Sequence, residues 1–267
     1  MKNILLLIHD DSGQEARLQA ALDVTRAVNG HLTCLDVSVV VPMVGAGVGV
    51  SGGAVLIELE RENETDNRAR TYPRLEKEDV SWSWIDTTNY IEPALEEACG
   101  LADLIVVNRQ LDSFPLPDMR TLAAGLVVKS GKPILAVPET VTGFNANGNA
   151  LVAWDGSREA SVALTAAVPL LQLAGSVTIV EVEDGSVKTG AEEAAAYLSR
   201  YGIHSMIVRA ATYGDDTGTV LLAKANSEKF DYLVMGGFGH SRFVEALFGG
   251  VTRKILSESA IPVLLAH

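Results

Sequence analysis

The sequence predicts an α/β protein made of two tandem, doubly wound parallel sheets of five strands each, with helices on both faces. Two observations carry this prediction. Short apolar strands alternate with amphipathic helices along the chain, a pattern typical of parallel sheets joined by right-handed helical crossovers. The series of elements also occurs twice, and each copy closes on a proline followed by an apolar strand, at 132–137 and 261–266.

The elements of the first copy follow from their apolar pattern. The run Ile4–Ile8 is apolar throughout, as expected of a parallel strand that is buried on both faces. We predict strands at 4–8, 32–37, 81–86, 104–107 and 134–137, and helices at 15–28, 55–78, 90–99 and 121–129.

The second copy repeats this order. After the strand 150–154, Asp155-Gly156-Ser157 supplies a turn and a helix N-cap, apolar residues recur at helical spacing from Ala160 to Leu171, and Gly175 ends the helix. Further strands are expected at 177–182, 206–210, 231–235 and 263–266, with helices at 192–200, 219–228 and 250–258.

The repeat divides the chain into a first domain at 1–138, a linker at 139–149 and a second domain at 150–267. In the linker, Thr, Gly and Asn replace the apolar pattern. The copies differ most at 41–79, where a glycine-rich stretch, Val41–Gly53, precedes a charged helix. This stretch lacks the Gly-x-Gly-x-x-Gly spacing of a dinucleotide loop, so a lid or a partner surface suits it better than a cofactor role.

The composition argues against two classes of partner. The net charge is −13 and 48% of residues are hydrophobic, so the chain can bury large cores but lacks the clustered Lys and Arg that nucleic acids or anionic membranes need. The apolar start of the chain ends at His9, too short for a membrane span and without a cleavage site. Two cysteines, Cys34 and Cys99, without metal-ligand spacing favour a reducing cytoplasm.

One motif of the second copy points to chemistry. Between a strand and a helix, the spacing Gly-x2-Gly-x9-Gly is formed by Gly236, Gly239 and Gly249, with Gly250 next. Ligands of open α/β sheets bind at the carboxyl ends of the strands, and a glycine-rich helix start offers free N–H groups to an anion. The alternative is that these glycines serve tight turns and packing alone, but the full spacing in this context favours a phosphate site.

With this motif the sequence resembles the universal stress protein family, in a tandem form, over nearly the whole chain. The resemblance implies an adenine nucleotide alpha hydrolase-like fold that binds ATP. It implies that Gly236, Gly239 and Gly249 hold ribose and phosphates. Gly250 stands where the family usually has Ser or Thr, which removes a hydroxyl donor to phosphate.

The same resemblance extends the expected site. It implies that Asp155 is the Asp that ends the first strand, with Ala153 before it on the adenine side. Val182 corresponds to the residue whose backbone meets adenine, and Met235 and Val251 fall on flanking contacts. It further implies that the last strands of the two units, 134–137 and 263–266, pair across a pseudo-twofold axis, so that one chain mimics a dimer.

The first copy fails the same test. It has Asn108-Arg109 where the glycines should stand, then Pro115 and Pro117. Side chains would fill the positions of close approach, and proline has no N–H to offer. We expect no ATP there, and Asp10 or Asp11 at the end of the first strand should serve as a cap.

Other polar residues are weaker candidates. His240-Ser241 lacks a third orienting group, so a rim contact to phosphate fits better than catalysis, and the histidines form no metal constellation. Arg253 and Lys254 either offset phosphate charge or lie on an exposed helix turn. The acidic pairs Glu62/Glu64 and Glu192/Glu193 are expected on solvated helix surfaces.

These observations predict a cytoplasmic, non-enzymatic regulatory or stress-response protein that binds ATP, ADP or AMP in the second domain. Whether Mg²⁺ accompanies the nucleotide, whether the chain dimerises further and which protein partner it has remain open. The alternatives are a slow ATPase on the same scaffold, with Asp155 as the one credible base, and an interaction module that binds no nucleotide.

Overall fold

The computed structural model describes residues 1–39, 50–111, 118–227, 229–239 and 250–267. The first half contains β1 (Asn3–Ile8), α1 (Gln14–Ala27), β2 (His31–Val39), α2 (Val50–Leu75), β3 (Ser81–Asn89), α3 (Ile91–Ala98), β4 (Leu104–Asn108), α4 (Met119–Ser130) and β5 (Ile134–Val137). The second half contains β6 (Asn149–Ala153), α5 (Arg158–Leu171), β7 (Ser176–Glu183), α6 (Ala191–Ser199), β8 (Ser205–Ala211), α7 (Thr217–Ala225), β9 (Tyr232–Gly236), α8 (Gly250–Glu258) and β10 (Val263–Ala266).

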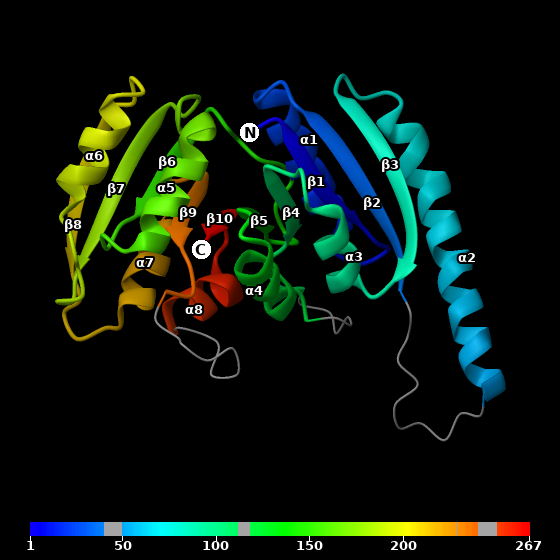
Figure 1. Cartoon of the computed structure of the whole chain (residues 1–267). Helices are drawn as coiled ribbons and strands as arrows, with labels where there is room; N and C mark the ends of the chain where they lie inside the picture. Colours follow the sequence, from blue (N-terminus) through cyan, green and yellow to red (C-terminus); the bar gives the residue numbers. More distant parts are fainter. Residues whose placement is uncertain (40–49, 112–117, 228, 240–249) are drawn as a thin grey trace.

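The strands form one sheet of ten, in the order β3-β2-β1-β4-β5-β10-β9-β6-β7-β8 (Figure 1). The α/β class, the doubly wound order and the parallel pairing within each half are as predicted. The pairing of the last strands, 134–137 with 263–266, is confirmed as well, and it joins the two five-stranded units into one sheet. β5 and β10 pair antiparallel, with Leu264 opposite Leu135, and this pairing joins the two halves. It removes two exposed sheet edges, each of which would otherwise present unpaired backbone groups.

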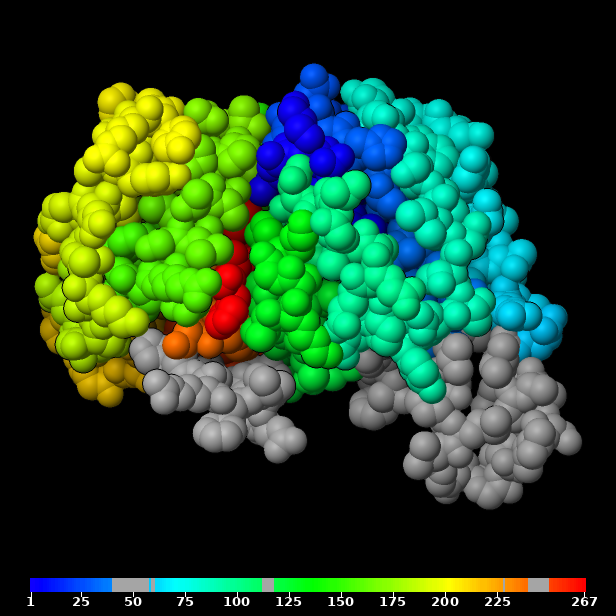
Figure 2. Space-filling model, in the orientation of Figure 1, coloured from blue at the N-terminus to red at the C-terminus, as the bar shows by residue number. Residues whose placement is uncertain are grey.

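Helices cover both faces of the sheet and bury a core under each. One core lies under α1, α2, α5 and α6 and includes Leu22 and Leu164. The other lies under α3, α4, α7 and α8 and includes Leu126 and Leu256. Each core draws residues from both halves, so the two repeats share their interior and their surface is continuous (Figure 2).

The predicted element bounds differ from the observed ones by a few residues, where a cap decides the end. α7 begins at Thr217 because the Asp216 side chain accepts a hydrogen bond from the Thr219 N–H at 3.0 Å. α2 begins at Val50 and runs beside the edge strand β3 past the ends of the strands (Figure 1). None of the described helices is both long and apolar enough to cross a membrane.

The segment predicted as a linker is packed between the halves. Phe144 is buried, and its ring centroid lies 5.0 Å from that of Tyr232 in β9. Its N–H donates to the Asp23 carboxylate of α1 at 2.9 Å. The connection is therefore anchored to an element of each half rather than crossing open solvent.

Candidate nucleotide site

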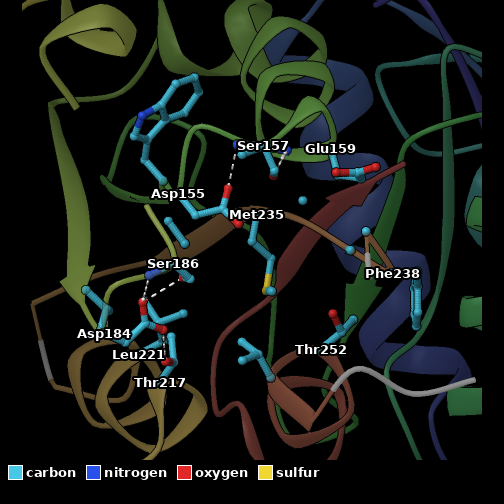
Figure 3. A pocket seen from close by; sticks show the side chains of 18 of the residues that line it. Asp155, Ser157, Glu159, Asp184, Ser186, Thr217, Leu221, Met235, Phe238 and Thr252 are labelled. Atoms are coloured by element: carbon cyan, nitrogen blue, oxygen red, sulfur yellow. Dashed lines mark hydrogen bonds between the residues drawn. The ribbon is translucent and has the colours of Figure 1, made fainter. Parts of the chain in front are cut away.

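A cavity of about 350 Å³ opens at the carboxyl ends of β6, β7 and β9, beside the first turns of α5 and α8 (Figure 3). This volume is in the range of small-molecule sites. It lies where the strand order of the second half reverses between β6 and β9, the position at which open α/β sheets bind ligands.

Eight of the nine residues predicted for the site line this cavity: Ala153, Asp155, Val182, Met235, Gly236, Gly239, Gly250 and Val251. The ninth, Gly249, lies outside the described residues, as do His240 and Ser241. Val182 and Met235 are buried and give the cavity an apolar floor, on which a flat ring system can rest. The structure thus brings together residues more than 80 positions apart, from Ala153 to Val251.

The motif glycines have different physical roles. A Cβ on Gly236 would lie 2.4 Å from the Ala160 backbone nitrogen, so this glycine is required by the packing of β9 against α5. A Cβ on Gly239 would meet the flexible carboxylate of Glu159 at 2.6 Å. A Cβ on Gly250 would meet nothing within 4 Å. The expectation that Gly236 serves ligand approach is therefore incomplete, because the close neighbour at its Cβ is a helix.

Asp155 is fixed by the turn that precedes α5. Its Oδ1 accepts the Ser157 N–H at 2.9 Å, while the Ser157 hydroxyl caps α5 by accepting the Ala160 N–H at 3.1 Å. Gly156 adopts φ 69°, and a Cβ there would overlap the Thr189 backbone. This turn presents the second Asp155 oxygen toward the cavity, where it can accept hydrogen bonds from sugar hydroxyls (Figure 3).

Two further carboxylates line the cavity and were missed by sequence reasoning. Glu159 comes from the first turn of α5, and Asp184 follows β7. Burial alone would raise the pKa of Asp184, but hydrogen bonds from Ser186 and Thr217 outweigh it and lower this pKa. No Lys or Arg is among the described lining residues, so phosphate binding there relies on backbone N–H groups.

α8 forms the wall opposite Asp155. Thr252, two residues after Gly250, is buried and lines the cavity. Lys254 points elsewhere: its ammonium contacts Asp216 at 3.1 Å and Thr219, and this holds α8 against α7. Thr219 and Lys254 lower the pKa of Asp216 to about 2. Of the two basic residues expected near phosphate, Lys254 is thus paired with α7, and Arg253 is exposed and does not line the cavity.

Two other lining residues, Phe238 and Leu221, also come from long-range packing. Phe238 lies between the motif glycines with φ 65°, a left-handed conformation uncommon for a residue with a Cβ, and it is buried. Leu221 reaches the cavity from α7. A bulky aromatic residue between Gly237 and Gly239 is the signal that could have identified Phe238 in the sequence. No local pattern identifies Leu221.

In the first half, side chains occupy the equivalent region. The strand registers place Asn108 at the position of Gly236. Asn108 is fully buried, its amide donates to the Gly13 carbonyl at 3.2 Å, and it accepts from Arg17 at 2.7 Å. Leu111 lies beside it, and both would overlap a Cβ on Gly13. Where Gly236 permits a close approach of strand and helix in the second half, the side chains of Asn108 and Leu111 form a plug in the first.

A buried cluster of titratable groups lies beside this plug. Glu64 is 3% exposed, and its Oε1 lies 2.6 Å from the His9 Nδ1 and accepts the Asp10 N–H at 3.0 Å. The expectation that Glu64 lies on a solvated face is therefore wrong, because α2 turns this residue toward the end of β1. Glu192, by contrast, is on an exposed surface, paired with Arg209. Asp11 accepts from the Gly13 N–H and from Arg17, so it holds the turn before α1. The expected cap is not formed, because Gly13 takes the N-cap position without a side-chain hydrogen bond.

Desolvation and charge shift the pKa values of this cluster. Burial raises the pKa of Asp36 to about 8, with the charges of Glu64 and Asp86 adding to it. Burial alone would lower the pKa of His9, but the hydrogen bond and charge of Glu64 raise it. The His9 contact and the Asp10 N–H lower the pKa of Glu64 despite its burial. Within the described residues, no group of three or more His, Cys, Asp or Glu side chains is arranged to hold a metal ion.

Comparison with known proteins supports the assignment of the second half. The model of the universal stress protein family matches residues 147–267, the part of the chain that holds the cavity. The resemblance to this family seen in the sequence is confirmed by this match for residues 147–267. No curated protein matches the chain.

Solved structures extend the likeness to the whole fold. A universal stress protein from Archaeoglobus fulgidus DSM 4304 is 17% identical with a TM-score of 0.77, and the match covers 99% of this chain and 95% of that one. A putative universal stress protein from Pseudomonas aeruginosa UCBPP-PA14 is 18% identical with a TM-score of 0.56, covering 100% and 93%. The cytoplasmic domain of a prokaryotic cation chloride cotransporter is 12% identical with a TM-score of 0.51, covering 99% and 94%. At these identities the likeness is one of fold.

Proposed function

We propose that this chain is a tandem universal stress protein that binds an adenine nucleotide in the cavity of its second half and acts by binding rather than by catalysis. The observation that carries the proposal is the cavity itself, which gathers the motif glycines, Asp155 and the first turn of α8 at the strand ends. The adenine ring would lie on the apolar floor of Val182 and Met235, the ribose near Asp155, and the phosphates toward Gly250. Domain bounds of 1–138 and 150–267 are part of this proposal.

We further propose that the first half binds no nucleotide. Asn108 and Leu111 fill the region that corresponds to the cavity, and Asn108 is held by Arg17 and the Gly13 carbonyl. Removing a buried amide from this network leaves Arg17 without one of its acceptors, so the plug is stable rather than displaceable.

A thermal-shift titration with ATP, ADP and AMP tests the proposal. A ligand that binds the folded state raises the melting temperature, and no shift at millimolar nucleotide would refute binding and leave an interaction module as the function. Gly239→Val should abolish the shift, because its side chain enters the cavity beside Glu159. The matched control is Gly100→Val, at an exposed glycine whose Cβ would meet nothing within 4 Å.

Absence of turnover is tested separately. We expect single-turnover mixtures of protein, ATP and Mg²⁺ to show no hydrolysis above the rate of ATP alone. Hydrolysis that Asp155→Ala removes would establish the ATPase alternative, with Asp155 as the base. In that mechanism Asp155 would act as the base while its Oδ1 still accepts the Ser157 N–H, because this hydrogen bond fixes the turn before α5.

A further inference from the structure

The first half reaches into the second at the far end of α8. Arg109 follows β4, and its guanidinium Nη1 donates to the carbonyl oxygens of Leu256 at 3.2 Å and Ser257 at 2.5 Å. Arg120, from the first turn of α4, donates to the Ser257 hydroxyl at 3.0 Å. Two arginines of the first half therefore hold the C-terminal turn of the helix whose first residues line the cavity of the second.

These contacts fit the needs of a helix end. The last carbonyls of a helix have no partner within the helix, and its C-terminus carries partial negative charge, so a guanidinium there is favourable. α8 has nine residues and is therefore about 14 Å long. A helix this short moves as one body. Its Ile255 and Leu256 are fully buried in the core. Fixing its C-terminal turn fixes where Gly250, Val251 and Thr252 lie in the cavity.

The pseudo-twofold symmetry shows that this contact is one-sided. The Arg109 N–H donates to the Val137 carbonyl at 2.9 Å, as the Gly237 N–H donates to the Ala266 carbonyl at 2.9 Å, so the two residues are equivalent. Gly237 has no side chain with which to reach the corresponding helix, α4. α4 ends instead at Gly131, whose φ of 62° closes the helix, whereas α8 is followed by Ser259 and Ala260.

We propose that Arg109 is a positioning residue for the phosphate end of the nucleotide site, supplied by the half of the chain whose own glycine loop is lost. The inference rests on the proposed function, since it assigns to α8 the contact with phosphate. Asn108 and Leu111 close the region of close approach in the first half, whereas Arg109, at the position of Gly237, anchors α8 in the second. Arg120 adds a second hydrogen bond at the same turn.

Isothermal titration with ATP and with adenosine tests this role. Adenosine reaches the floor and Asp155 but not α8, so Arg109→Ala should raise the Kd for ATP about threefold to fivefold and change the Kd for adenosine less than twofold. Arg109→Lys keeps the charge and should restore part of the loss. Arg74→Ala is the matched control, because Arg74 makes two hydrogen bonds in the first half, to Glu15 and Gln19, far from α8 in sequence and contact.

The outcomes are distinct. A selective loss of ATP affinity, with faster amide exchange at Ile255–Ser257, supports the proposal. An equal weakening of ATP and adenosine, or no change in either, overturns it and leaves Arg109 as an interface contact. If Arg109→Ala does not fold, the ATP to adenosine ratio of Arg109→Lys decides in the same way. A wild-type chain that binds neither ligand refutes the proposed function itself.

Discussion

Replacing Gly250 by Ser should strengthen phosphate binding, because it restores a hydroxyl where the family usually has one. The structure accommodates the change: a Cβ at Gly250 meets nothing within 4 Å, and the residue is exposed at the first position of α8. A hydrogen bond to a charged group contributes about 1.5–3 kcal/mol, and we take about 1 kcal/mol for this exposed site. This corresponds to a Kd for ATP that is about fivefold lower.

The control for this experiment is Gly250→Ala. Both variants lose the same backbone freedom, which should stabilise the folded protein by about 0.4–1 kcal/mol without any ligand. The ratio of their Kd values, measured by isothermal titration, therefore isolates the hydroxyl. We expect the Ser variant to bind ATP and ADP more tightly than the Ala variant, and the two variants to bind adenosine equally. Equal affinity of the Ser and Ala variants for ATP would show that the phosphates do not lie at the start of α8.

Three further changes test the packing and charge of the two halves. Gly236→Ala should reduce the free energy of unfolding by about 1–3 kcal/mol in urea titrations, because its Cβ would overlap the Ala160 backbone; stability equal to that of Gly250→Ala would contradict this packing role. Glu159→Gln should lower the Kd for ATP about threefold in the absence of Mg²⁺, by removing a carboxylate beside Gly239, and an unchanged Kd would place the phosphates elsewhere. Asp36→Asn should flatten the pH dependence of stability. The pKa of Asp36 is raised to about 8 in the folded state, so the folded protein binds an extra proton and the wild-type free energy of unfolding falls as pH rises from about 4 toward 8. Parallel stability curves for wild type and variant between pH 5 and 9 would refute this assignment.

Much of the fold could be predicted because it depends on local sequence. The apolar run Ile4–Ile8 predicts a strand, and the helical spacing from Ala160 to Leu171 predicts a helix. The alternation of strands and helices along the chain then limits the topology to parallel sheets. The shared core could not be predicted from local sequence, and the pairing of the last strands was expected only from the family resemblance. The core depends on the antiparallel contact of Leu135 with Leu264, two residues that only the folded chain brings together.

The buried cluster shows the same limit for single residues. Glu64 and Glu62 look alike in a charged helix, yet Glu64 is buried against His9 while Glu62 is exposed. Helical periodicity gives the angle between two side chains around the helix axis. It does not tell which face of the helix packs on the sheet when that face holds few apolar residues. The mistaken surface assignment of Glu64 follows from this, because its partners, His9 and Asp10 after β1 and Asp36 on β2, lie far away in the sequence.

The sequence by itself determined the repeat, the strand and helix order, and the glycine loop of the second half, because apolar periodicity and the spacing of glycines are properties of the chain alone. Tertiary structure decided what each glycine touches and what replaces it. Gly236 faces α5, Asn108 plugs the equivalent region, and Arg109 holds α8 from the other half. The physical reason is that hydrogen bonds and close packing act between atoms within a few ångströms, whatever their separation along the chain.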